Sequence, residues 1–140
     1  MKRPLGFTII ELLFVTVLIA TASILFFVQK DDFEVAARDE KRKIAINAMY
    51  YSLEEVYYKN HTSYPRTLSE DTLPSVDGTL FTDPNGIELG QTTIEEQGEV
   101  IPVESDYRYE GTDCSGDACK SYTLRAIMEN EDDYVKTSRN

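Results

Sequence analysis

The chain has 140 residues and a formal net charge of −11, from 14 lysines and arginines against 25 aspartates and glutamates. This length has room for one domain. Such an acidic surface argues against direct binding to the phosphate backbone of nucleic acids, and it favours solubility and self-repulsion.

Residues 7 to 28, FTIIELLFVTVLIATASILFFV, form an apolar run that contains one charged residue, Glu11. At roughly 1.5 Å of rise per residue, about 22 residues make a helix of about 33 Å, which is enough to cross the hydrocarbon core of a bilayer. The basic leader MKRPLG precedes the run and no A-x-A-like cleavage site follows it, so the pattern differs from a secretory signal peptide. The basic end should stay cytoplasmic while the bulk of the chain is exported.

The carboxylate of Glu11 requires an explanation. Near the middle of a membrane helix it would cost about 2.5 to 3.5 kcal/mol on insertion scales. One explanation is favourable placement near the N-terminus of the helix dipole. The other is an ion pair: cutting the bond between Gly6 and Phe7 would create a positive amine at Phe7, and a neighbouring subunit staggered along an axis could bring that amine to Glu11.

The leader ending in Gly6, the following Phe7 and the glutamate at the fifth position after the leader resemble the class III signal of type IV pilins and type II secretion pseudopilins. The resemblance implies removal of residues 1–6 by a prepilin peptidase, N-methylation of Phe7, and polymerisation through the helix. NHTSYPRTL, DPNG, YRYEG and YTLRAIME are similar to the globular part of the same family. Many major pilins have a glycine and a proline where Ala20 and Val28 stand here, so partial melting of this helix is not expected.

The helix is expected to continue from residues 7–28 through residues 29–60, because residues 33 to 60 lack glycine and proline and carry apolar residues near 3.6-residue spacing: Ala45, Met49, Leu53, Val56 and Tyr57. The charge run 38–43, RDEKRK, is interpreted as a solvated face, with contacts to lipid head groups or to acidic neighbours as the alternative. The helix should end near Asn60, where NHTSYP supplies a polar residue and then a proline.

The segment 65–98 contains turn sequences at SVDG, DPNG and EEQG, and it is predicted to be an irregular connection. Some secretion pseudopilins hold calcium in the corresponding loop, and here Asp83, Asn85 and Glu88 are candidate oxygen ligands. Their spacing is not that of an EF-hand. A tight turn without a cofactor is therefore the preferred interpretation.

The last third of the chain is predicted to form an antiparallel sheet, with strands over residues 99–103, 106–111 and 120–129. Cys114 and Cys119 flank a loop that contains glycine, and after export they would face an oxidising compartment. A disulfide is the preferred interpretation, because C-x₄-C without further thiols or a nearby histidine is a poor zinc set.

The polar tail, residues 130–140, is predicted to be mobile. The whole pattern predicts an α+β fold in which a long N-terminal helix, with a membrane half and an amphipathic half, packs on a small antiparallel sheet within residues 61–140. A domain of this size requires the helix for its core.

Two functions follow from the pattern, and neither is enzymatic, because no nucleophile–base pair, phosphate loop or metal cluster is evident. The first is a structural subunit of a type IV pilus or a type II secretion-like filament. Its partners would be other copies, other pilins or pseudopilins, the prepilin peptidase, an inner-membrane assembly platform and, before assembly, membrane lipid. The second is a membrane-tethered exported binding or adhesion module that does not polymerise. In both, the chain would cross the cytoplasmic membrane once; in the first it would then join an extracellular pilus or a cell-envelope pseudopilus.

Overall fold

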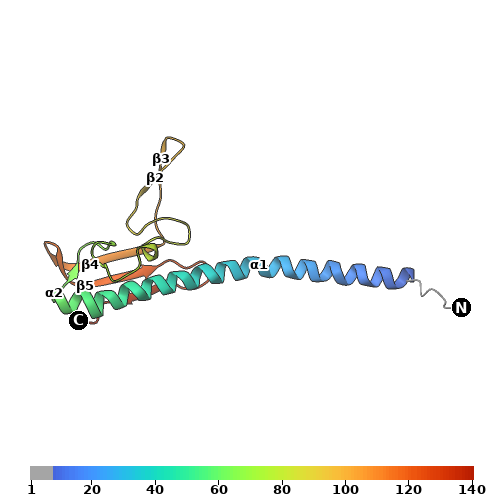
Figure 1. Cartoon of the computed structure of the whole chain (residues 1–140), viewed down its shortest axis with the longest axis horizontal. Helices are drawn as coiled ribbons and strands as arrows, with labels where there is room; N and C mark the ends of the chain where they lie inside the picture. Colours follow the sequence, from blue (N-terminus) through green and yellow to red (C-terminus); the bar gives the residue numbers. More distant parts are fainter. Residues whose placement is uncertain (1–7) are drawn as a thin grey trace. The chain divides into compact units, whose positions relative to one another are not determined.

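The computed structural model describes residues 8–140, which divide into two compact units, one ending at Ala36 and the other running from Ala37 to Asn140. The longest element of the structure is an N-terminal helix (Figure 1). It consists of α1 (Ile9–Ser52), a π-helical turn η1 (Leu53–Tyr57) and α2 (Tyr58–His61). Together these make 53 helical residues in succession, which confirms the single long helix and its end near Asn60.

Both ends of this helix have recognisable caps. The Thr8 hydroxyl accepts a hydrogen bond from the backbone N–H of Glu11 at 3.3 Å, so Thr8 and Glu11 have the spacing of a capping box. At the other end Thr62 adopts the left-handed region, with φ of 55°, and its N–H donates to the carbonyl of Tyr58 at 2.8 Å. A residue in that conformation satisfies a free carbonyl and ends the helix.

The main sheet lies in the second unit and is antiparallel throughout. Its central strand is β5, which pairs with β4 along one edge and with both β1 and β6 along the other. The strands are β1 (Tyr64–Pro65), β4 (Tyr107–Ser115), β5 (Ala118–Ala126) and β6 (Tyr134–Thr137). The strands predicted at 106–111 and 120–129 are therefore confirmed, although β4 is longer and β5 begins and ends earlier.

The prediction of a mobile tail over residues 130–140 is wrong, because β6 lies in this segment. Tyr134–Thr137 pairs with Thr123–Ala126 of β5, and the N–H of Ser138 then donates to the carbonyl of Tyr122 at 3.2 Å. The free edge of β5 supplies the hydrogen-bond partners, and the short segment YVKT has enough β-forming residues to use them. Composition alone did not reveal that edge.

A separate two-stranded sheet is formed by β2 (Thr93–Glu96) and β3 (Glu99–Pro102). The strand predicted at 99–103 is confirmed as β3, whereas the prediction of an irregular connection over 65–98 is wrong at β2 and at the short 3₁₀ helix η2 (Gly78–Phe81). Gln97 and Gly98 make the turn, with φ of 54° and 86°. Two positive φ angles in a two-residue loop fit the twist of a tight hairpin.

The hydrophobic core belongs to the second unit and joins its part of α1 to the sheet. Figure 1 shows β4 and β5 beside this part of the helix. The helix contributes Ala45, Ile46, Met49 and Leu53, all at most 1% exposed. They pack with Tyr64, Leu73, Phe81, Tyr122 and Leu124 from the loops and the sheet. The α+β fold predicted from the sequence, a long helix packed on a small antiparallel sheet, is therefore what the structure shows.

Candidate assembly surface

The N-terminal part of α1 presents apolar side chains on every side. Every large apolar side chain from Ile9 to Phe27 is at least 39% exposed, and Val15 has the lowest value. The helix is long and apolar enough to cross a membrane. A helix that is apolar all round requires either lipid or other apolar helices around it.

The hydroxyl groups within this apolar segment are satisfied by the helix itself. Thr16 donates to the carbonyl of Leu13 at 2.8 Å, and Ser23 donates to that of Ile19 at 2.8 Å. Thr21 donates to a carbonyl one turn earlier at 3.0 Å. Such bonds remove the cost of placing a hydroxyl in an apolar surround.

Glu11 is different, because its carboxylate pairs with no side chain within the described residues 8–140. It lies in the first turn of α1, where the helix dipole favours a negative charge. This placement is compatible with both explanations given for it above. Gly6 and Phe7 lie outside the described residues, so cleavage between them, methylation of Phe7 and its pairing with Glu11 stay predictions.

The prediction that the charge run 38–43 forms a solvated face is wrong for two of its members. Asp39 is 2% exposed and Arg42 is 1% exposed. Arg42 donates to Asp39 at 2.9 Å and to Asp106, the residue before β4, at 2.7 Å. Arg42 can be buried because Asp106, which is distant in the sequence, pairs with it in addition to Asp39. Spacing within the helix cannot reveal this distant partner.

Glu129, which follows β5, completes this ionic cluster. It accepts from Arg42 at 2.8 Å and from Arg38 at 2.6 Å. Hydrogen bonds from Arg38 and Arg42 hold the pKa of Glu129 at about 2, below its ordinary value of 4.5. The Asp39 carboxylate also accepts the backbone N–H of Glu129 at 3.0 Å. The cluster therefore ties the helix to the segment that leaves the sheet.

A second buried carboxylate, Glu54, lies at the other end of the core and is 4% exposed. It accepts hydrogen bonds from the hydroxyls of Tyr64 at 3.1 Å and Tyr122 at 2.9 Å. The backbone N–H of Arg139 donates to it at 3.2 Å. Burial, and then the hydrogen bond to Glu54, raise the pKa of Tyr122 above its ordinary range.

The sequence did not identify Glu54 as buried. The apolar spacing placed Val56 on the inner face instead, yet Val56 is 44% exposed. The π-helical turn over Leu53–Tyr57 explains the difference, because hydrogen bonds from i to i+5 widen the turn and change which residues face inward.

Of the three candidate calcium ligands, Asp83 and Asn85 take part in hydrogen bonds within the protein. The Asp83 carboxylate accepts the backbone N–H groups of Asn85 and Ile87, both at 2.9 Å, and that of Asp106 at 2.8 Å. The Asn85 side chain donates to Asp106 at 2.8 Å, and Glu88 is exposed. Among the described residues no group of three or more His, Cys, Asp and Glu side chains could hold a metal ion. Asp83 thus supports a tight turn through its hydrogen bonds.

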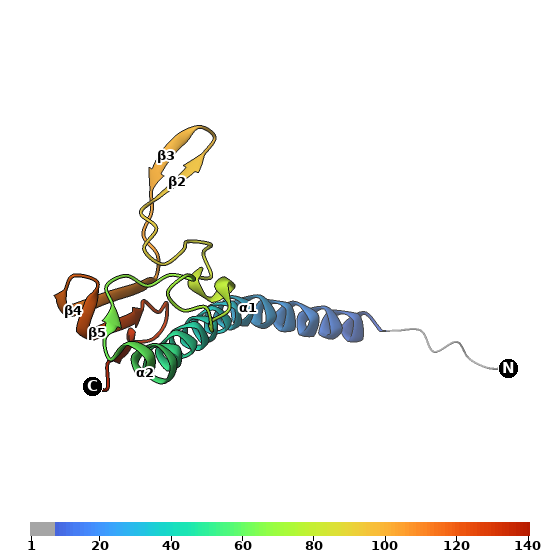
Figure 2. The same ribbon diagram turned by 60° about the vertical axis from the view of Figure 1, so that its left-hand side comes forward.

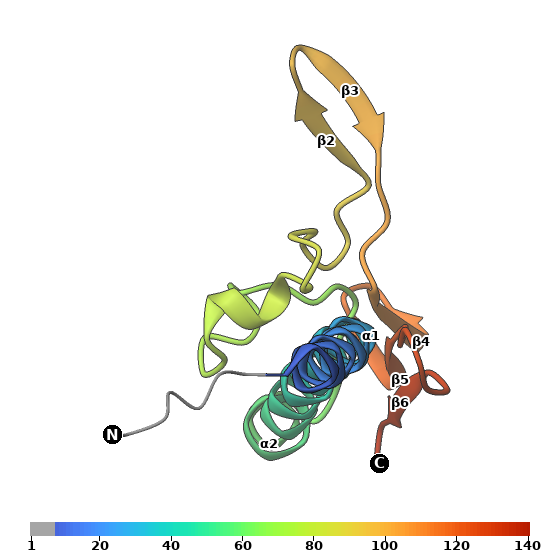
Figure 3. The same cartoon turned by 90° about the vertical axis from the view of Figure 1, so that its right-hand side faces the viewer.

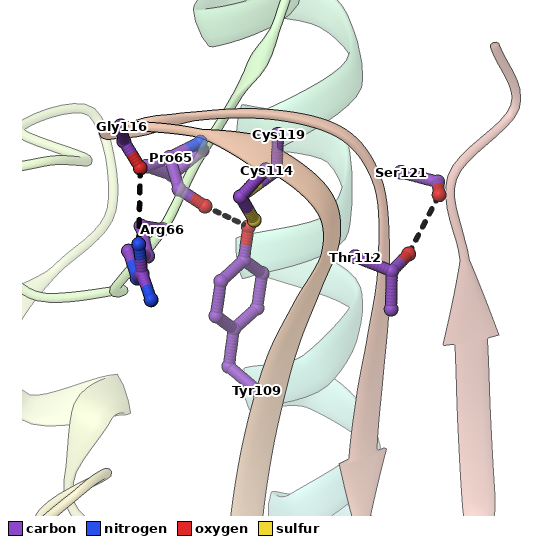
Figure 4. Close-up of a disulfide and its surroundings, with 8 residues drawn as sticks. All are labelled: Pro65, Arg66, Tyr109, Thr112, Cys114, Gly116, Cys119 and Ser121. Carbon is purple, nitrogen blue, oxygen red and sulfur yellow. Dashed lines mark hydrogen bonds between the residues drawn. A yellow bond between two sulfur atoms is a disulfide. The ribbon is translucent and has the colours of Figure 1, made fainter.

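Cys114 and Cys119 form the predicted disulfide, which closes the hairpin between β4 and β5 (Figure 4). The two cysteines lie directly opposite one another in the strand register. Gly111 makes this possible, because a Cβ at that position would lie 2.7 Å from the Cys119 sulfur. Beside the disulfide, the Tyr109 hydroxyl donates to the carbonyl of Pro65 at 2.6 Å.

Comparisons with protein-family models, with curated proteins and with solved structures found no match. The function of this chain is therefore inferred from its own residues and geometry.

Proposed function

We propose that this chain is a structural subunit, a pilin or pseudopilin, of a type IV pilus or a type II secretion-like filament. The observation that carries the proposal is the helix from Ile9 to Phe27, which is apolar on all sides, satisfies its own hydroxyls and retains one carboxylate, Glu11. In this proposal a prepilin peptidase first cuts between Gly6 and Phe7. The chain has no catalytic activity.

The physical argument for assembly concerns what can replace lipid around such a helix. Burial of apolar surface is favourable at roughly 25 cal/mol per Å², so the segment leaves a bilayer only for an equally apolar surround. Other copies of the same helix supply that surround. Contacts between unlike patches of identical subunits that do not close into a ring generate an open helical filament. The stagger of such a filament is the geometry that would pair Glu11 with the Phe7 amine of a neighbour.

The second unit has properties that suit the outside of such a filament. Its core is complete within residues 37–140, and it carries a disulfide, as exported domains often do. Because the leader contains Lys2 and Arg3, its removal changes the formal charge from −11 to −13. We place this acidic unit in water around a central bundle of helices, with the N-terminus starting on the cytoplasmic side of the membrane.

Electron microscopy of sheared surface material, with an antibody against residues 61–140, tests the proposal. The wild-type chain should label filaments. Val17→Asp, which puts a charge in the apolar segment, should abolish labelled filaments once the amounts of membrane-inserted protein are matched. Val135→Asp is the matched control, because Val135 is 44% exposed and its cross-strand partner is Arg125.

The second candidate is a membrane-tethered exported module for binding or adhesion. The same apolar helix supports it, because a single span of this length is a sufficient anchor. Wild-type protein that occurs only as membrane monomers, in cells that express the assembly genes, would favour this module over the filament subunit.

A further inference from the structure

The β2–β3 hairpin is not part of the main sheet of the second unit. In the part of the chain that the structure describes, its strands pair only with one another. Figures 2 and 3 show the hairpin extending away from the β4–β5 sheet. Val100 is 71% exposed on it. Because an isolated two-stranded hairpin is marginally stable in water, a surface that covers it would stabilise it.

The tip of the hairpin carries two like charges in direct opposition. Glu96 and Glu99 are cross-strand partners on either side of the Gln97–Gly98 turn, so their side chains share one face. Like charges directly opposite in a sheet are destabilising. Neither glutamate forms an ion pair with any of residues 8–140. The tip therefore favours a partner that brings positive charge.

A cavity of about 300 Å³ at the root of the same hairpin offers that charge. Its apolar and aromatic walls include Leu68, Leu89, Tyr107 and Tyr109, and its cationic side chains are Arg66 and Arg108. This volume is at the lower end of the range for pockets that hold a small group.

The two guanidinium groups of this cavity are open to an incoming carboxylate. Arg66 donates to the carbonyl of Gly116 at 3.3 Å, and no carboxylate within the described residues pairs with it. Arg108 pairs with Glu104 at 2.6 Å, but their side chains are 44% and 71% exposed. An ion pair so exposed is weak and exchanges readily with another carboxylate.

The tip cannot reach the cavity of its own chain. Thr92, just before β2, and Glu104, just after β3, line the cavity, so it lies where the hairpin begins. Four residues per strand, at roughly 3.3 Å each, hold the tip about 13 Å beyond that point. A second copy is the occupant that the charges favour. Tip-to-root contacts between copies generate a filament when the rotation from one copy to the next does not close a ring.

We propose that the tip of the β2–β3 hairpin binds in the Arg66–Arg108 cavity of the next copy of this chain. Glu96 and Glu99 face the two guanidinium groups, whose planar donors suit paired hydrogen bonds to carboxylates. The contact would relieve the repulsion at the tip and cover the hairpin. It rests on the proposed assembly into filaments, and it adds a second interface to that between the helices.

Charge reversal in the full-length chain, expressed in its own cells, tests this contact. Glu96→Arg with Glu99→Arg, or Arg66→Glu with Arg108→Glu, should each lower the yield of sheared filaments at least about tenfold, the equivalent of 1.4 kcal/mol. Combining all four changes should restore most of the yield, because the ion pairs are reversed rather than lost. Glu110→Arg with Asp132→Arg makes the same change in net charge as the tip variant at other exposed positions, and it should leave the yield unchanged.

A photo-cross-linking amino acid at position 97 gives a second readout without altering any charge. Irradiation should produce dimers and longer ladders, with cross-links at residues 66–68 or 104–109 of a second copy. These products should disappear in Arg66→Glu with Arg108→Glu. The same probe at position 132 should not label the cavity.

The possible outcomes separate this contact from the proposed function. Wild-type filaments whose yield and cross-links are insensitive to both charge reversals would overturn the hairpin contact alone. Cross-links from position 97 to another protein, or to lipid, would overturn it as well. If the wild-type chain forms no filaments, both proposals are wrong.

Discussion

The carboxylate of Glu54, in the helix, accepts a hydrogen bond from the Tyr122 hydroxyl of β5 at 2.9 Å within the core. The same carboxylate accepts from Tyr64 and from the backbone N–H of Arg139. One buried group therefore joins the helix, two strands and the C-terminal segment. Because a buried carboxylate is costly unless its lone pairs are used, each of these donors contributes to stability.

Removing the Tyr122 hydroxyl should be destabilising although the ring remains. We expect Tyr122→Phe to lower the unfolding free energy of the 37–140 unit by about 1 to 3 kcal/mol, because Glu54 loses a donor that water does not replace. Urea denaturation measures the change. The control is Tyr51→Phe, at a ring that is 55% exposed, where the effect should be near zero. Equal midpoints for the two variants would contradict a structural role for this bond.

The pKa of Glu129 predicts a loss of stability in acid. Arg38 and Arg42 hold that pKa at about 2 in the folded state, against an ordinary value of 4.5. The folded state therefore binds the proton less readily than the unfolded state. The stabilisation is complete above pH 4.5 and is lost as the pH falls towards 2.

Glu129→Gln is the variant that tests this pH dependence. It should be less stable than the wild type at pH 6, and the difference should shrink as the pH falls from 4.5 to 2. Urea midpoints at several pH values give the comparison. Glu131→Gln, which removes an exposed partner of Lys43, is the control and should change the profile less. A constant difference between Glu129→Gln and wild type at all pH values would show that the ion pairs do not contribute.

The cost in stability of replacing Gly111 should depend on whether the disulfide is present. Closing a six-residue loop contributes roughly 2 kcal/mol on the chain-entropy estimate, so Cys114→Ser with Cys119→Ser should lower the melting temperature of the 37–140 unit. Gly111→Ala places a methyl group 2.7 Å from the Cys119 sulfur, where the bridged sulfur cannot rotate away. Its cost should be larger in the disulfide-bonded protein than in the double serine variant. If Gly111→Ala lowered the stability of the disulfide-bonded protein and of the double serine variant equally, the contact between the new methyl group and the Cys119 sulfur would not be the cause.

The sequence predicted those features that depend on short-range pattern. The continuous helix followed from a span without glycine or proline and with helical spacing. The disulfide followed from two cysteines around a loop that contains glycine. Strands β4 and β5 followed from alternating aromatic and aliphatic residues.

What the sequence did not reveal depends on partners distant along the chain. The sequence predicts Arg42 to be solvated. Its burial depends on Asp106 and Glu129, which are 64 and 87 residues away and which a local pattern does not reveal. Burial of Glu54 required both a π-helical turn and the Tyr122 hydroxyl. Strand β6 required the free edge of β5, which exists only after the sheet has formed. In each case long-range contacts outweighed the local pattern.

Processing at the N-terminus is predicted by the residues around Gly6. The mature chain should begin at Phe7 with a methylated amine, because a peptidase that cuts beside a membrane has to accept a residue almost without a side chain. Mass spectrometry of the N-terminal peptide from membrane-extracted protein gives the answer. Replacing Gly6 with valine should leave the leader attached. Wild-type protein that starts at Met1, in cells that contain the peptidase, would contradict this prediction.

Glu11→Gln distinguishes a role of the charge in assembly from a role at the helix terminus. The substitution keeps the size of the side chain and removes the charge, so membrane insertion should be unchanged or improved. If Glu11 only complements the helix dipole, the expected loss is about 0.3 to 1 kcal/mol of helix stability and filaments should still form. If it pairs with the Phe7 amine of a neighbour, filament yield should fall sharply while the membrane pool stays constant. Immunoblots of sheared and membrane fractions measure both quantities.

The control is Thr8→Ala, which removes the hydroxyl cap on the Glu11 N–H and weakens the start of the helix without changing the charge. We expect Thr8→Ala to assemble and Glu11→Gln to remain in the membrane.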